Sequence, residues 1–173
     1  GNYDRRATRA MVNLPLSETF AIRVAAAMDK SEGYVDMAPG SAMGDKYGAT
    51  DLSATRISAF WQPADNFDWF LSYENFNDQG TGQIPTITGG SSRSAYIQEP
   101  GFNDFVIDSF RTRMNYNFDS GITLSYIGGY TDSSRESVWD RSWSPDKYEW
   151  GGCVECTHEA TQHELQIKNE DSA

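Results

Sequence analysis

The chain has 173 residues, enough for one ordinary domain and giving no reason to expect two. Hydrophobic residues make up 38% of it and no run of about 18 apolar residues occurs, which excludes a membrane-spanning helix. The formal net charge of -11 argues against nucleic acid as a partner, because phosphates would be repelled. Aromatic residues reach 13% and glycines number 15, a composition that favours strands and turns over helix bundles.

Seven segments alternate between apolar and polar residues with the period of a strand. They are residues 8–16, 20–29, 53–62, 67–77, 109–118, 122–130 and 161–169. In the second, Phe20, Ile22 and Val24 share one face and Arg23 lies on the other. Each has about the length that a tilted strand needs to cross the hydrocarbon layer of a membrane. The sequence therefore predicts an all-β fold, an antiparallel up-and-down meander of about seven strands of a larger transmembrane β-barrel.

The connections between these segments alternate strictly in length. Short links lie at residues 16–19, 63–66 and 119–121. Long polar stretches fill residues 30–52, 78–108 and 131–160. A barrel in an outer membrane has tight turns on its periplasmic rim and long loops on its external rim, so the alternation predicts this arrangement.

Five arginines lie on the strand face opposite the apolar residues: Arg9, Arg23, Arg56, Arg111 and Arg113. Each would cost about 2–4 kcal/mol if it faced lipid at mid-depth. The polar face is therefore expected to line a wet lumen. A soluble antiparallel sheet with one solvated face would give the same alternation, so this alternative stays open.

Aromatic residues gather on the apolar face beside the short links, as an interfacial girdle would. They are Phe20, Trp61, Phe67, Trp69, Tyr116 and Phe118. By contrast, Phe60, Phe70 and Phe76 fall on the polar face. Either they contact something that fills the lumen, or the assumed register is wrong across residues 60–69.

Three strings carry a family resemblance: VNLPLSETFAIRVAAAMDKSEGYVDMA, ATRISAFWQPADNFDWFLSYENFNDQGTG and TQHELQIKNED. Together they resemble the β-barrel of TonB-dependent outer-membrane receptors of Gram-negative bacteria. The resemblance implies a barrel of about twenty-two strands around a plug domain, in contact with outer-membrane lipid and the TonB complex. It also implies import of a small-molecule ligand such as a siderophore or cobalamin.

Two departures from this family pattern are visible. No plug or TonB box precedes Gly1, and Ala173 is not the aromatic residue expected at the end of such a barrel. Seven strands are also fewer than a membrane barrel needs. We therefore expect the whole chain, residues 1–173, to be an internal part of a receptor barrel whose plug and remaining strands lie elsewhere. A small chain that oligomerises into a closed barrel is the alternative.

Cys153 and Cys156 form a Cys-x-x-Cys pair in the third long stretch, with His158 and His163 downstream. This resembles a zinc motif superficially. However, the histidine spacing is loose and an external loop is an oxidising environment. A local disulfide is the preferred interpretation, with zinc or free thiols as alternatives, and no metal site or cofactor is expected.

Other motifs carry less information. The string GQIPTITGGSSRSAY lacks the context of a phosphate-binding loop and is interpreted as an external loop. Loop acids offer a divalent-cation site or simply a solvated surface: Asp36, Asp45, Asp51, Asp140, Asp146, Glu149 and Glu155. Glu164 shares the polar face with Gln162, Gln166 and Lys168, which predicts a ladder of lumenal polar contacts. No catalytic constellation is readable, so an enzyme is not expected.

Three functions compete at this stage. The first is active import by a TonB-dependent receptor. The second is a passive porin, whose arginines would favour anions. The third is a soluble β-rich binding or structural module.

Overall fold

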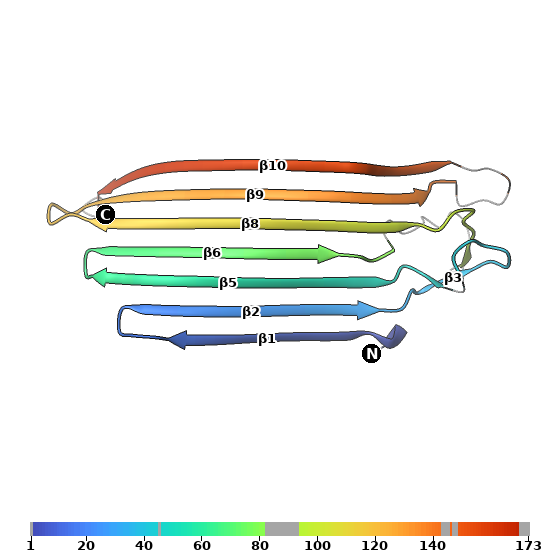
Figure 1. Ribbon diagram of the computed structural model, residues 1–173, viewed down its shortest axis with the longest axis horizontal. Coiled ribbons are helices and arrows are strands. Elements are labelled where there is room, and N and C mark those ends of the chain that lie inside the picture. Colours follow the sequence, from blue (N-terminus) through green and yellow to red (C-terminus); the bar gives the residue numbers. More distant parts are fainter. Residues whose placement is uncertain (1, 45, 82–93, 143–145, 147–148, 170–173) are drawn as a thin grey trace.

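The computed structural model describes residues 2–44, 46–81, 94–142, 146 and 149–169. A seven-stranded antiparallel sheet dominates it, in the order β1-β2-β5-β6-β8-β9-β10 (Figure 1). The sheet comprises β1 (Arg6–Pro15), β2 (Phe20–Ser31), β5 (Thr50–Ala64), β6 (Phe67–Asp78), β8 (Phe102–Asn117), β9 (Ile122–Asp140) and β10 (Trp150–Asn169). Each strand pairs with the strands next to it in this order, and β1 and β10 are the two edge strands. The predicted all-β antiparallel meander is confirmed.

The three tight turns lie at one end of the sheet (Figure 1). They join β1 to β2, β5 to β6 and β8 to β9. In the last of these, Gly121 has a φ of 77° and its amide donates to the carbonyl of Phe118 at 3.0 Å. A residue with a side chain would be strained there, so glycine suits this turn.

The longer connections differ from the sequence prediction. The strands β8, β9 and β10 extend well into the stretches predicted as loops, and β9 pairs with β10 as far as Asp140 opposite Trp150. Most of residues 131–160 is therefore strand, and the prediction of a long loop there was wrong. These parts of the strands show no alternation of apolar and polar residues in the sequence, because both of their faces carry polar and charged side chains.

The register divides the side chains of the large sheet into two faces. Directly opposed residues share a face, so Val12, Val24 and Ile57 lie together, as do Asn13, Arg23 and Ser58. We call the first of these the apolar face and the second the polar face. The alternation of apolar and polar residues along each strand therefore matches that of the neighbouring strands.

Burial in the large sheet is the reverse of that in a globular protein. Its buried side chains are polar, and those on the polar face include Ser58, Ser72, Ser109 and Ser125. Large apolar side chains stay open, such as Leu165 at 67% and Ile167 at 73% exposure. Within the described residues, the buried apolar side chains lie outside this sheet. The large sheet is thus a single layer without an apolar core.

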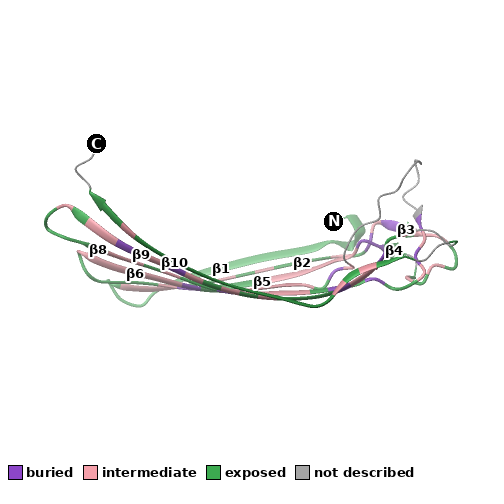
Figure 2. Ribbon diagram, turned by 90° about the horizontal axis from the view of Figure 1, so that it is seen from above, coloured by how far each residue is buried: buried purple, intermediate pink, exposed green. Residues whose placement is uncertain are grey.

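The only apolar core of the described part of the chain lies in a small lobe. The lobe consists of β3 (Val35–Met37), β4 (Lys46–Tyr47), β7 (Ser94–Ala95) and the residues around them, with β3 antiparallel to β4 and parallel to β7. Its core contains Val35, Tyr47, Ala95 and Ile97. Figure 2 shows the large sheet bent into a trough, with the lobe near one end on the concave side.

Candidate functional site: the polar face

All five predicted arginines lie on the polar face. The residues directly opposite them in the register are Ala27 for Arg9, Ser58 for Arg23, Glu74 for Arg56, Ser72 for Arg111 and Phe70 for Arg113. Residues on a common face of a sheet point to the same side. The sheet therefore gathers the arginines on one surface although they come from four strands.

Two of these arginines have partners on the neighbouring strand. The guanidinium of Arg56 donates to Glu74 Oε2, with Nε at 2.7 Å. The Nε of Arg23 donates to Asn13 Oδ1 at 2.6 Å. The first contact neutralises a charge, whereas the second leaves the charge of Arg23 in place.

Arg111 and Arg113 differ, because no described acidic side chain forms an ion pair with either of them. Their opposed residues explain this. Arg111 lies between Ser72 and Gly129, and Arg113 lies between Phe70 and Ile127. Two positive charges therefore stand two residues apart on one face of β8, both exposed.

Two hollows lie on the polar face and adjoin at Arg111 and Phe70. One has a volume of about 780 Å³ and is lined by β6, β8, β9 and β10, including Arg113 and Gln162. The other has about 680 Å³ and reaches from β1 to β8, including Arg23. Small residues such as Gly129 leave this space open. The hollows make the arginine-bearing surface concave.

The register also places the three inward phenylalanines. Phe60 lies directly opposite Phe70, and Phe76 lies opposite Ala54, all on the polar face. Phe70 lines both hollows and Phe60 lines one. Of the two interpretations left open, the register error is wrong. The bulge in β5 lies after Trp61 and so does not affect the parity of Phe60.

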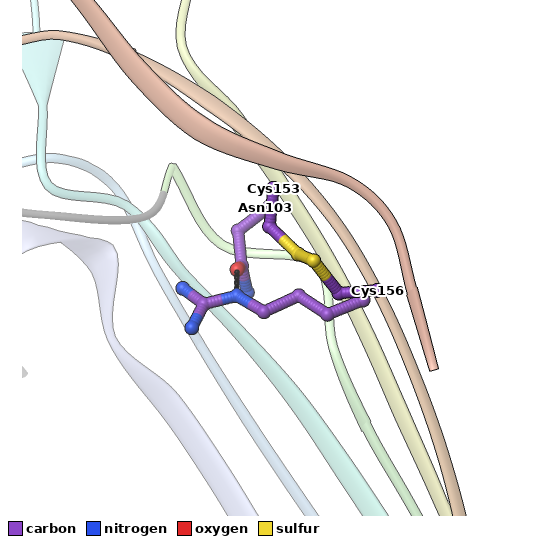
Figure 3. The surroundings of a disulfide bond; sticks show 4 residues. Asn103, Cys153 and Cys156 are labelled. Carbon is purple, nitrogen blue, oxygen red and sulfur yellow. Dashed lines mark hydrogen bonds between the residues drawn. A yellow bond between two sulfur atoms is a disulfide. The ribbon is translucent and has the colours of Figure 1, made fainter. Parts of the chain in front are cut away.

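Cys153 and Cys156 form a disulfide with a Cα–Cα distance of 5.8 Å. They lie within β10 and not in a loop, at a bulge where Cys153 opposes Ser137 and Cys156 opposes Arg135. Glu155, inside the bulge, has a φ of 54°. Figure 3 shows the disulfide beside Asn103, which accepts a 3.0 Å hydrogen bond from Arg135 Nε. The disulfide therefore joins the two residues that flank the bulge.

The geometry does not support the zinc alternative. His158 opposes Ser133 on the polar face, whereas His163 opposes Gly128 on the apolar face. There, His163 Nδ1 lies 2.7 Å from the hydroxyl of Tyr126 and the two rings stack. Among the described residues, no three His, Cys, Asp or Glu side chains come together as metal ligands would.

Glu164 lies on the polar face opposite Ile127. Its Oε1 accepts a hydrogen bond from Gln166 Nε2, and Gln166 opposes Ser125. Elsewhere on this face, Asn115 Nδ2 donates to Asp68 Oδ1 at 2.9 Å. Polar contacts thus run between neighbours on this face near the end with the tight turns.

Three of the predicted loop acids contact residues near them. Asp36 pairs with Lys46, Asp51 pairs with Lys30 at 2.9 Å, and Asp140 accepts hydrogen bonds from Gln98 and Ser142. The Asp36 carboxylate raises the pKa of Lys46. Asp45 and residues 82–93, which include most of GQIPTITGGSSRSAY, lie outside the described residues.

The lobe has one further feature that the sequence analysis missed. The phenol of Tyr47 is completely buried and donates to the carbonyl of Thr81 at 2.7 Å. Burial raises the pKa of Tyr47 to about 12. No pattern in the sequence marks this tyrosine as a core residue, because its strand has only two residues.

Arg135 and Asn103 were also missed as residues of the polar face. They line a hollow of about 580 Å³, together with Tyr34 and Trp139. Their parity continues that of Arg111 and Arg113 in the same hairpin, so extending the two strands would have found them.

No family model, curated protein or solved structure matches this chain. None of the helical residues that the structure describes forms a helix long and apolar enough to cross a membrane.

Proposed function

We propose that this chain is part of the barrel wall of an outer-membrane active-transport receptor of the TonB-dependent kind. In this proposal the apolar face contacts lipid and the polar face lines the lumen. External solute is imported with energy relayed from the inner membrane. The plug and the remaining strands of the barrel belong to other parts of the same protein.

The reversed burial of the large sheet carries this proposal. A sheet in water hides its apolar residues against a second layer, as sandwiches do. Here the apolar residues are exposed and the serines are buried. A lipid environment would satisfy the apolar face, and a wet lumen would satisfy the polar face.

Aromatic rows support the same orientation. Near the tight turns, Phe20, Trp61 and Trp69 oppose one another on three successive strands of the apolar face. Farther along, Tyr73, Phe110 and Tyr130 form a second such row. The next row consists of Asn75, Asp108, Asp132 and Glu159. An apolar band with aromatic borders and a charged row beyond is the pattern of a strand sheet in a membrane.

The lobe supports an external position for the longer connections. It packs its own small core beside the end of the sheet opposite the tight turns. Asp140 at the end of β9 binds the backbone of Gln98 at 2.9 Å and so links two of the longer connections. Ordered external connections are the parts of a barrel that recognise ligand.

A passive porin is the second candidate. Arg111 and Arg113, which form no ion pair with a described residue, favour it, because open cationic walls bias a pore toward anions. Energy coupling separates the two candidates. If import is active, cells that make the intact protein should accumulate its solute only while the inner membrane is energised, and a protonophore should abolish uptake. Uptake that continues with protonophore would favour the porin.

Two adjacent alanines test the membrane orientation. Ala25 lies on the polar face and Ala26 lies on the apolar face of the same strand. A water-soluble maleimide should label the Ala25→Cys variant and spare the Ala26→Cys variant when the intact protein is in lipid. Equal labelling of both cysteines, in protein that stays soluble without detergent, would favour a soluble β-rich module instead.

A further inference from the structure

We propose that the polar face holds a binding site for a small oxyanion with more than one negative charge, centred over Ser58 and Ser72 between Arg23 and Arg111. The inference rests on the proposed function, since it names the chemical class of solute that passes along the lumenal wall. The ligand carries carboxylate or phosphate groups, which arginine binds in the same way.

The four residues form one straight row across the sheet. Arg23 opposes Ser58, Ser58 opposes Ser72, and Ser72 opposes Arg111. Neighbouring strands lie about 4.8 Å apart, so the two arginine Cα atoms are about 14 Å apart. Two long side chains that lean inward from these positions can contact one anion between them.

The serines provide the floor of the site. Ser58 is 7% exposed and Ser72 is 9% exposed, and both line the 680 Å³ hollow. Neither hydroxyl has a hydrogen-bond partner among the residues that the structure describes, although neither is sealed from solvent. Both hydroxyls can therefore donate to an anion that sits above them.

The arginines provide the charge. Arg111 has no acidic partner within the described part of the sheet, and Arg23 uses its Nε on the neutral Asn13. Their terminal nitrogens remain available as paired donors, the geometry that matches a carboxylate or phosphate. Arg56 borders the same hollow, but its charge is already balanced by Glu74.

Arg113 adds a second positive charge beside Arg111. It stands on the same face as Arg111, two residues along β8, with apolar residues opposite it on both sides. Two like charges so close destabilise each other, and a bound anion relieves that repulsion. The side chains of Phe60 and Phe70 line the 680 Å³ hollow together with Arg111, so the site also accommodates an apolar portion of the ligand.

The test measures binding of citrate and of pyrophosphate to the intact protein in detergent micelles, by calorimetry at low salt. Saturable binding is expected, and Arg111→Gln and Arg23→Gln should each raise the Kd by about tenfold or more, as expected for a lost charged hydrogen bond. Arg111→Lys keeps the charge but loses the paired donors of the guanidinium, so it should weaken binding less than Arg111→Gln does. The tighter of the two probes identifies the ligand group as carboxylate or phosphate.

Arg9→Gln is the matched control. Arg9 lies on the same face, two rows away from Arg23, and lines neither hollow. Its loss should leave the Kd within about twofold, because Arg9 is too far away to donate a hydrogen bond to an anion in the hollow and its charge acts only through water. An equal loss in Arg9→Gln and Arg111→Gln would overturn the site in favour of a diffuse positive field. Absence of saturable binding of both probes would also overturn it.

These outcomes are separate from those of the proposed function. Anion binding in micelles needs neither a membrane nor an energised cell. A protein that binds citrate but passes solute without energy keeps the anion site and loses active import. A protein that imports actively but binds neither probe keeps the function and loses the anion site.

Discussion

The large sheet and the lobe bury opposite kinds of residue. In the lobe, Val35, Tyr47 and Ile97 are nearly inaccessible and pack together. In the sheet, serines are buried while leucine and isoleucine are exposed. One chain thus contains a unit with its own apolar core and a unit whose apolar residues stay exposed. The contrast teaches that strand content alone does not describe a β-structure, because two sheets of one chain can bury opposite kinds of residue.

The largest effect should come from the core of the lobe. Ile97→Ala removes a side chain that is 1% exposed, which should cost about 2–5 kcal/mol of local stability. Hydrogen exchange of the lobe amides should accelerate, while the amides of the large sheet should change little. The control is Ile167→Ala in β10, where the side chain is 73% exposed. If Ile97→Ala disrupts the sheet equally, the two units are not independent.

A charge on each face tests the other half of the comparison. Met11 and Val12 are adjacent and similarly exposed, at 60% and 53%, but lie on opposite faces. In lipid vesicles, Val12→Arg should lower the free energy of unfolding by about 2–4 kcal/mol, and Met11→Arg by much less. Urea titration followed by tryptophan fluorescence measures both. Equal effects would mean that the apolar face does not contact lipid.

The buried phenol of Tyr47 gives the lobe a pH dependence. Its pKa is about 12 in the folded protein and about 10 in an unfolded chain. The folded state therefore disfavours the phenolate. The contribution of Tyr47 to the free energy of unfolding is fully present below pH 10 and falls by about 2–3 kcal/mol as the pH rises to 12. Hydrogen exchange or tyrosine absorbance of the lobe should report this. Tyr47→Phe should remove the titration, although it also loses the bond to Thr81.

The smallest effect should come from the disulfide. It closes a segment of only four residues, so the chain-entropy contribution is at most about 2 kcal/mol. The Cys153→Ser, Cys156→Ser double variant should keep the sheet and loosen only the bulge. Mass spectrometry should find no alkylatable thiol in the unreduced protein. Two reactive thiols without reductant would contradict the pairing.

The sequence predicted the parts of the fold that follow a two-residue period. The face of every predicted arginine follows from that period. Arg23, for example, lies between the apolar Ile22 and Val24 in the chain. The period fails where both faces become polar. For that reason the sequence predicts a loop over the second half of β9, residues 131–140, and places the disulfide in the same loop, whereas both lie in strands.

Cross-strand neighbours could not be predicted residue by residue. The row of Arg23, Ser58, Ser72 and Arg111 depends on the register of three strand pairs. The bulge after Trp61 shifts the register of one of these pairs, β5 with β6. The lobe was missed for another reason. Its strands are two or three residues long, which is too short for any period to be visible.

The unequal lengths of the strands give the sheet a stepped edge. The first strand has 10 residues and the last has 20. At the end away from the tight turns, β9 continues for residues 136–140 beyond Arg135, which is near the level where β1 begins. At about 3.3 Å per residue this is a crest of about 17 Å. The β9–β10 side of the sheet therefore ends farther from the tight turns than the β1–β2 side does, so the two edges of the sheet expose backbone over different lengths.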